Sequence, residues 1–135
     1  MPGRILLIDD EPDCLELFAY RLRASGYVLT TACDGQEGLE KARQDPPDLI
    51  LTDLMLPRLN GYELCRLLKQ DTACQHVPIV LLSASTVRPE EEHLARSCGA
   101  DAYLNKWADA PVLLREVEAL LAASRRRSPD AASPA

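Results

Sequence analysis

Residues 5–8 read Ile-Leu-Leu-Ile, a continuously apolar run that is followed at once by Asp9 and Asp10. Two more runs of this kind, at residues 49–51 and 79–82, also stop at a polar residue. Apolar runs without alternation are typical of strands buried on both faces, as in a parallel sheet that helices cover on both sides. The three runs therefore predict the centre of such a sheet.

Weaker strand patterns occur at residues 27–32 and 102–104, and helical patterns lie between the strands. From Leu15, apolar residues recur at i, i+3, i+4 and i+7. Pro12 falls in the first turn of this expected helix and Gly26 just beyond its end. The chain thus alternates strand and helix from its first apolar run.

Capping signals mark the start of the next two helices. Asp34 precedes Glu37, and Asn60 precedes Glu63, each with the spacing of a capping box. In such a box, the first side chain accepts the backbone N–H three residues on, and the Glu reaches back to the N–H of the capping residue. We therefore expect helices to begin at these two positions.

Helical patterns over about residues 89–98 and from about residue 109 complete the alternation of strand and helix. This order predicts right-handed crossovers and an α/β fold with a doubly wound parallel sheet. The length of 135 residues fits one domain, which we place at residues 4–124. Residues 125–135 change to arginine, serine, proline and alanine, and we expect them to form a disordered tail.

Composition excludes several classes of function. The net charge of −6 argues against nucleic acid as a direct partner, because phosphate binding needs a basic face. No apolar run approaches the roughly 20 residues of a membrane span, and the N-terminus lacks the apolar region of a signal peptide. We therefore expect a cytoplasmic protein without membrane contact. The five cysteines lack metal-site spacing and are predicted to be reduced, structural thiols.

Polar residues follow the predicted strands, in the region of an open parallel sheet where ligands bind. Two carboxylates follow the first strand, one follows the third, a hydroxyl follows the fourth and an ammonium follows the fifth: Asp9, Asp10, Asp53, Ser83 and Lys106. Nothing in the strand pattern requires charge at these positions. We expect these side chains to crowd one edge of the sheet.

Crowded carboxylates repel one another, so a bound cation stabilises them. Mg²⁺ suits oxygen ligands of this kind and often binds phosphate oxygens as well. A carboxylate can then attack phosphorus and form an acyl phosphate, with a lysine and a hydroxyl stabilising the transferred group. Asp53 stands alone at the end of the central run and is the candidate nucleophile. The adjacent Asp9 and Asp10 suit metal binding, although capping of the first helix is an alternative for both.

Over residues 4–124, the chain resembles the receiver domain of two-component response regulators. The segments that carry the resemblance are Leu-Ile-Asp-Asp-Glu at 7–11, Asp-Leu-Ile-Leu-Thr-Asp at 48–53, Met-Leu-Pro at 55–57 with Asn-Gly at 60–61, Leu-Ser-Ala at 82–84 and Gly-Ala-Asp-Ala-Tyr-Leu-Asn-Lys at 99–106. Each segment alone is a weak signal, but together, in this order, they are specific. The family implies a flavodoxin-like (βα)5 fold with strand order 2-1-3-4-5, and a phosphorelay signalling role without enzymatic turnover.

The resemblance implies a role for each site residue. Asp53 would accept a phosphoryl group from a sensor histidine kinase or a histidine phosphotransfer protein. Asp10, Asp53 and the backbone carbonyl of Met55 would ligate Mg²⁺, with Asp9 reaching the ion through water.

By the same resemblance, Ser83 and Lys106 would contact the phosphoryl oxygens. Tyr103 would be the switch residue that turns inward as Ser83 moves toward the phosphate. The face formed by the fourth helix, fifth strand and fifth helix would then bind a downstream protein partner, and a homodimer through this face is possible in the family.

Two features depart from the family pattern. Trp107 stands where the family usually has a proline in a cis peptide. A cis bond before a non-proline residue costs about 2.5–4 kcal/mol, so we expect a trans bond and an altered loop after Lys106. Met55 and Ser85 occupy the two positions that set the lifetime of the acyl phosphate in this family. Neither carries a carboxylate or carboxamide to orient water, which predicts slow self-dephosphorylation.

Two other functions remain alternatives. A phosphatase that forms an aspartyl phosphate needs a second acid two residues after the nucleophile, and here that residue is Met55. A receiver-like module that only binds partners would not need the acidic cluster. Trp107 is the one residue that favours such an unphosphorylated module.

Overall fold

The computed structural model of the chain describes residues 3–84, 88–107 and 110–127. The strands are β1 (Arg4–Ile8), β2 (Val28–Ala32), β3 (Leu49–Asp53), β4 (Ile79–Ser83) and β5 (Ala102–Asn105). The helices are α1 (Pro12–Ala24), α2 (Gly35–Gln44), α3 (Gly61–Gln70), α4 (Pro89–Ser97) and α5 (Ala110–Arg127). The predicted alternation of strand and helix is confirmed.

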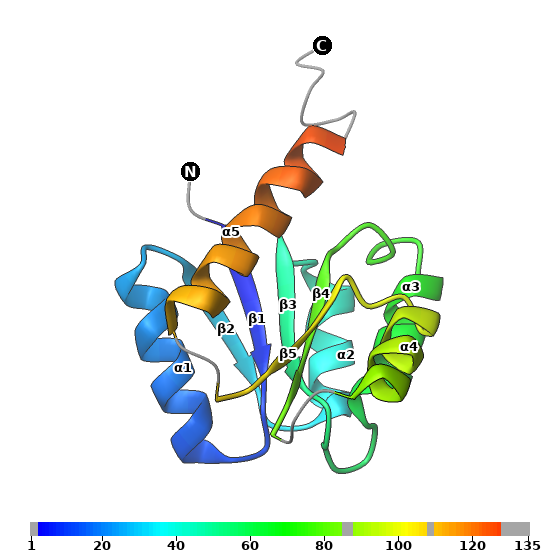
Figure 1. Cartoon of the computed structure of the whole chain (residues 1–135). Helices are drawn as coiled ribbons and strands as arrows, with labels where there is room; N and C mark the ends of the chain where they lie inside the picture. The colour runs from blue at the N-terminus through cyan, green and yellow to red at the C-terminus, as the bar shows by residue number, and fades with distance from the viewer. Residues whose placement is uncertain (1–2, 85–87, 108–109, 128–135) are drawn as a thin grey trace.

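The strands form one parallel sheet in the order β2-β1-β3-β4-β5 (Figure 1). This is the flavodoxin-like order expected from the resemblance. The central strand β3 is buried along its whole length, and so is β4. Their continuous apolar runs are therefore explained by helices on both faces of the sheet.

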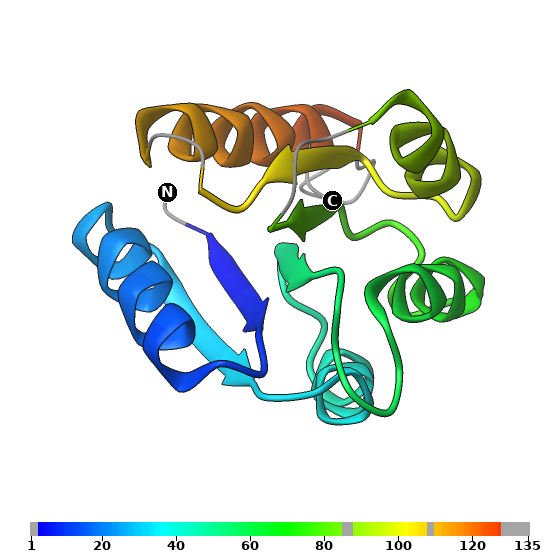
Figure 2. The same cartoon turned by 60° about the horizontal axis from the view of Figure 1, so that its bottom comes forward.

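Helices α1 and α5 cover one face of the sheet, and α2, α3 and α4 cover the other (Figure 2). On the first face, Phe18 and Leu22 of α1 pack with Val117 of α5 against the strands. On the second face, Leu64 and Leu68 of α3 are fully buried. Burial of each such side chain stabilises the fold by roughly 1.5–3 kcal/mol, so the two layers hold the sheet rigidly.

The capping signals are used in two different ways. At α3, Asn60 accepts the N–H of Glu63, and Glu63 reaches back to the N–H of Asn60, which confirms the predicted capping box. At α2, Asp34 accepts the N–H of Glu37 at 2.7 Å. The Glu37 carboxylate instead accepts the N–H of Cys33, one residue before the cap. The start of α2 is thus fixed as predicted, but by an altered box.

Helix α5 is longer than expected. It continues to Arg127, so residues 125–127 are helical, where a disordered tail was predicted. Alanine and arginine are strong helix formers, which accounts for the extension of the helix. The rest of the predicted tail, residues 128–135, lies outside the described residues.

Other predictions from composition concern the cysteines and the membrane. All five cysteines are free thiols, and four of them are buried, which fits their reading as small core residues. Cys33 is the exposed one. Among the described residues, no helix has an apolar stretch long enough to cross a bilayer.

The contacts of Glu37 predict a pH-dependent contribution to stability. The N–H of Cys33, then the Cys33 thiol and Lys41, lower the pKa of Glu37 from 4.5 to about 2. A carboxyl with a lowered folded-state pKa stabilises the fold above its unfolded pKa, and this contribution is lost as the pH falls toward the folded value. The side chain is 36% exposed, so solvent screening reduces the effect.

We expect Glu37→Gln to lower the free energy of unfolding by about 1 kcal/mol at neutral pH. The deficit should shrink between about pH 5 and pH 3, measured by urea denaturation. Glu40→Gln on the exposed side of the same helix is the control and should have less than about half this effect. A deficit of the same size at every pH would contradict the assignment.

Candidate functional site

Strand register brings two carboxylates together at the carboxyl ends of β1 and β3. Ile8 pairs with Thr52, so the residues that follow them, Asp9 and Asp53, lie side by side at these strand ends. Asp9 is 2% exposed and Asp53 is 7% exposed. Two buried acidic side chains at adjacent strand ends are unfavourable without a positive partner.

Lys106 supplies that partner from the end of β5. Ser83 pairs with Asn105, and the N–H of Lys106 donates to the carbonyl of Ser83 at 2.7 Å. The buried Lys106 Nζ then lies 2.7 Å from Asp9 Oδ2 and 3.2 Å from Asp53 Oδ2. The structure therefore brings the predicted ammonium between the two predicted carboxylates.

The direction of the Asp9 carboxylate argues against simple helix capping. The capping residue of α1 is Glu11, whose side chain makes no capping hydrogen bond. Asp9 Oδ1 accepts the N–H of Glu11 at 3.0 Å, and its other oxygen faces Lys106. Asp9 is thus oriented toward the site by the turn that leads into α1.

Asp10 completes an acidic cluster that fits a divalent cation. One carboxylate oxygen from each of Asp9, Asp10 and Asp53 lies within 4.8 Å of the others. Asp10 is exposed, whereas the other two are buried, so the cluster opens to solvent on one side. Three carboxylates and one ammonium leave a net charge of −2, and hard divalent ions prefer such oxygen ligands. The residues present therefore suit Mg²⁺.

The electrostatics of the pair Asp53–Lys106 follow from burial and from neighbouring charge. Burial raises the pKa of Asp53 against the effect of Lys106, and the negative charge of Asp9 raises it further. For Lys106, burial favours the neutral amine, but the hydrogen bond to Asp9 and the charges of Asp53 and Asp9 outweigh it and raise its pKa. The two carboxylates thus favour the protonated form of Lys106, whereas burial and the charge of Asp9 disfavour ionisation of Asp53.

The remaining predicted residues surround this cluster. The backbone N–H of Met55 hydrogen-bonds to Asp53 and favours its ionised form, while the Met55 side chain is 74% exposed. Ser83 is buried at the end of β4. Tyr103 is 8% exposed, so its side chain lies inside the fold.

Trp107 lies beside the lysine. The Lys106–Trp107 peptide is trans, as predicted, since no cis bond occurs among the described residues. The Trp107 ring centre is 5.6 Å from Lys106 Nζ, within the range of a cation–π contact, and 6.4 Å from the ring of Phe18. The indole packs on α1 but remains 57% exposed. The predicted change in the loop concerns residues 108–109, which lie outside the described residues.

Two neighbours of the site were not predicted from the sequence. The buried Cys14 thiol lies close enough to Lys106 for that charge to lower its pKa, although burial is stronger and raises it. Glu91 of α4 accepts the hydroxyl hydrogen of Tyr103 at 2.7 Å. The sequence carried no signal for either contact, because a lone cysteine and a glutamate in a first helical turn are both common.

Comparison with known proteins identifies a family and several relatives of this chain. The family model for the response regulator receiver domain matches residues 5–118. The alkaline phosphatase synthesis transcriptional regulatory protein PhoP of Bacillus subtilis is 42% identical over 132 residues, which are 98% of this chain and 52% of PhoP. The polar-differentiation response regulator DivK of Brucella anthropi is 32% identical over 90% of this chain and 98% of DivK. The chain therefore spans about half of PhoP and nearly all of DivK.

Solved structures agree in fold over most of the chain. A receiver domain of a signal transduction histidine kinase from Syntrophus aciditrophicus has a TM-score of 0.84 and 31% identity, and the match covers 94% of this chain and 96% of that one. The receiver domain of the sensor histidine kinase PA1611 from Pseudomonas aeruginosa has a TM-score of 0.82 and 28% identity over 90% of this chain and 99% of its own. The latter holds a magnesium ion coordinated in its active site cleft.

The acidic cluster predicts a measurable affinity for Mg²⁺. Trp107 is the single tryptophan and lies beside Lys106, so its fluorescence should report binding. We expect a saturable change on Mg²⁺ titration, and a dissociation constant at least about tenfold higher for Asp10→Asn, which removes one charged ligand. Asp13→Asn on the exposed side of α1 is the control and should bind as the parent does. Equal affinities for the two variants would refute the assignment of Asp10.

Proposed function

Because the chain belongs to the response regulator receiver family, we propose that Asp53 accepts a phosphoryl group from a sensor histidine kinase or a histidine phosphotransfer protein. Receiver domains are the regulatory parts of two-component signalling. The observation that carries the proposal is the buried Asp53 carboxylate, which faces the Lys106 ammonium at 3.2 Å beside two further acids. The proposed setting is the cytoplasm, where such kinases present their phosphohistidine.

In the proposed step, an oxygen of Asp53 attacks the phosphorus of a phosphohistidine. An O–P bond forms, the N–P bond breaks, and its electron pair returns to the imidazole nitrogen. Lys106 turns from Asp53 to a phosphoryl oxygen and keeps its proton, while Ser83 offers its hydroxyl to another oxygen. Asp9 holds Lys106 throughout, since its oxygen lies 2.7 Å from Nζ.

The cofactor in this proposal is Mg²⁺. Asp10, Asp53 and the backbone carbonyl of Met55 would hold the ion, with Asp9 acting through water. When bound, the ion neutralises negative charge on the phosphoryl oxygens. The net charge of the cluster supports this assignment because the single ammonium of Lys106 does not balance the three carboxylates.

The proposed output is a change of the face formed by α4, β5 and α5. Ser83 would move toward the phosphoryl group, and Tyr103, whose side chain already lies inside the fold, would pack into the space that Ser83 leaves. Phosphorylation then shifts a two-state equilibrium by its differential affinity for the active state. This face would bind a downstream protein or a second copy of the chain. The net negative charge of the chain disfavours direct binding to nucleic acid, because phosphates repel it.

The acceptor can be tested by intact mass after incubation with a small acyl phosphate and Mg²⁺. We expect a stable adduct of one phosphoryl group on the parent chain and none on Asp53→Asn. Asp48→Asn, the same substitution at the exposed residue just before β3, should still form the adduct. Turnover of the donor without an adduct would indicate a phosphatase, and no reaction would indicate a module that only binds partners.

The lifetime of the adduct tests the role of the residue at position 55. The exposed Met55 side chain cannot orient an attacking water, so we expect decay of the phosphorylated chain to be slow. Met55→Asn supplies a carboxamide and should decay severalfold faster, whereas Met55→Leu should decay as the parent does. A half-life of seconds for the parent would contradict the expectation. Ser85, the second position involved, lies outside the described residues.

A further inference from the structure

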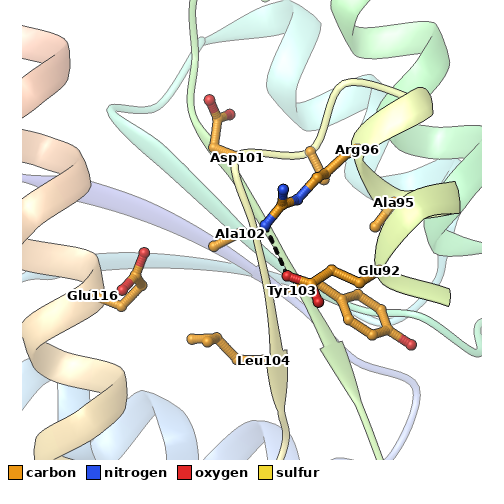
Figure 3. A pocket seen from close by; sticks show the side chains of 9 residues that line it. Glu92, Ala95, Arg96, Asp101, Ala102, Tyr103, Leu104 and Glu116 are labelled. Atoms are coloured by element: carbon orange, nitrogen blue, oxygen red, sulfur yellow. Dashed lines mark hydrogen bonds and ion pairs between the residues drawn. The ribbon is translucent and has the colours of Figure 1, made fainter. Parts of the chain in front are cut away.

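A polar cavity of about 190 Å³ lies between α4, β5 and α5, on the face discussed above. Figure 3 shows that the Tyr103 side chain crosses from β5 toward α4 along this cavity, with its hydroxyl directed to the helix. Glu116 of α5 lies on the opposite side of the cavity. The Tyr103 side chain therefore spans the contact between β5 and α4 at the wall of the cavity.

Glu91, in the first turn of α4, fixes the end of this side chain. Its Oε2 accepts the Tyr103 hydroxyl at 2.7 Å, a distance typical of a strong hydrogen bond from a hydroxyl to a carboxylate. Its Oε1 lies 3.8 Å from Arg88 Nε, and its backbone carbonyl accepts the Tyr62 hydroxyl at 3.5 Å. Glu91 is thus held from three directions, one of which is Tyr103.

We propose that Glu91 is a positioning residue that holds Tyr103 in its buried position and thereby ties the start of α4 to β5. The proposal concerns a contact between α4 and β5 and does not need phosphorylation to be true. Its meaning for signalling rests on the function proposed above, in which Tyr103 fills the space that Ser83 leaves.

The chemistry of the Tyr103 hydroxyl supports this role. The side chain is 8% exposed, so the hydroxyl needs a partner inside the fold, and a buried hydroxyl without one is unfavourable. Burial raises the pKa of Tyr103 most, Ser83 opposes that rise, and the hydrogen bond to Glu91 adds to it. Tyr103 therefore stays protonated and donates its hydroxyl hydrogen to the Glu91 side chain.

The geometry also links the helix to the phosphorylation site. Tyr103 is near enough to Ser83 for the serine to affect its ionisation, and Ser83 directly follows Leu82, the strand partner of Asp53. A chain of contacts therefore runs from the edge of the site through Ser83 and Tyr103 to Glu91. Loss of the Glu91 carboxylate would remove the last contact of this series and leave the site residues themselves unchanged.

The test measures the exposure of the Tyr103 ring directly. The chain has four tyrosines, so ¹³C-labelled tyrosine gives few signals, and Tyr103→Phe assigns the one of interest. With a soluble paramagnetic probe, we expect the relaxation of the Tyr103 signal to rise severalfold in Glu91→Ala. Glu90→Ala removes a neighbouring, exposed carboxylate from the same helical turn and should leave the signal unchanged. Glu91→Gln keeps an acceptor oxygen and should protect the ring as the parent does.

Equal protection of Tyr103 in the Glu91→Ala and Glu90→Ala variants would overturn the proposal, and so would equal exposure in Glu91→Ala and Glu91→Gln. If Glu91→Ala does not fold, Glu91→Met, which keeps the length of the side chain without an acceptor, takes its place in the comparison. Failure of the parent chain to form the phosphoryl adduct would refute the function of Asp53, but it would leave this measurement of Tyr103 unaffected.

Discussion

The ion pairs of Lys106 with Asp9 and Asp53 are the interaction on which the site depends. All three side chains are nearly buried, and removing a charge from water costs several kcal/mol unless a partner compensates it. Lys106 compensates two carboxylates at once, at 2.7 Å and 3.2 Å. The remaining negative charge suits the cluster to a divalent cation, because the ammonium alone does not neutralise it.

The rigidity of the fold keeps these charged side chains close together despite their repulsion. Parallel register places the ends of β1, β3, β4 and β5 at one edge, and two apolar layers hold these strands from both faces. Capping at α2 and α3 fixes where the chain leaves that edge. A charged cluster needs such a frame, since repulsion among its carboxylates would otherwise separate them.

Strand β5 serves the site and the outer face together because its side chains alternate. Tyr103 points into the layer of α2, α3 and α4, while Ala102 and Leu104 belong to the layer of α1 and α5. The strand ends at Asn105 and is followed by Lys106, whose neighbour Trp107 packs on Phe18 of α1. One short strand and the two residues after it thus contact helix α4, the acidic cluster and helix α1.

Sequence alone predicted the strands, the helix starts and the residues at the strand ends, because apolar runs, capping pairs and breakers act over a few neighbouring positions. It placed Asp9, Asp10, Asp53 and Lys106 in one cluster, since parallel strands share a carboxyl edge. Only the tertiary structure decided which carboxylates Lys106 touches, that Tyr103 meets Glu91, and that the last helix extends to Arg127. Such contacts depend on side-chain direction and on the spacing between packed helices, and neither quantity is encoded in a local pattern.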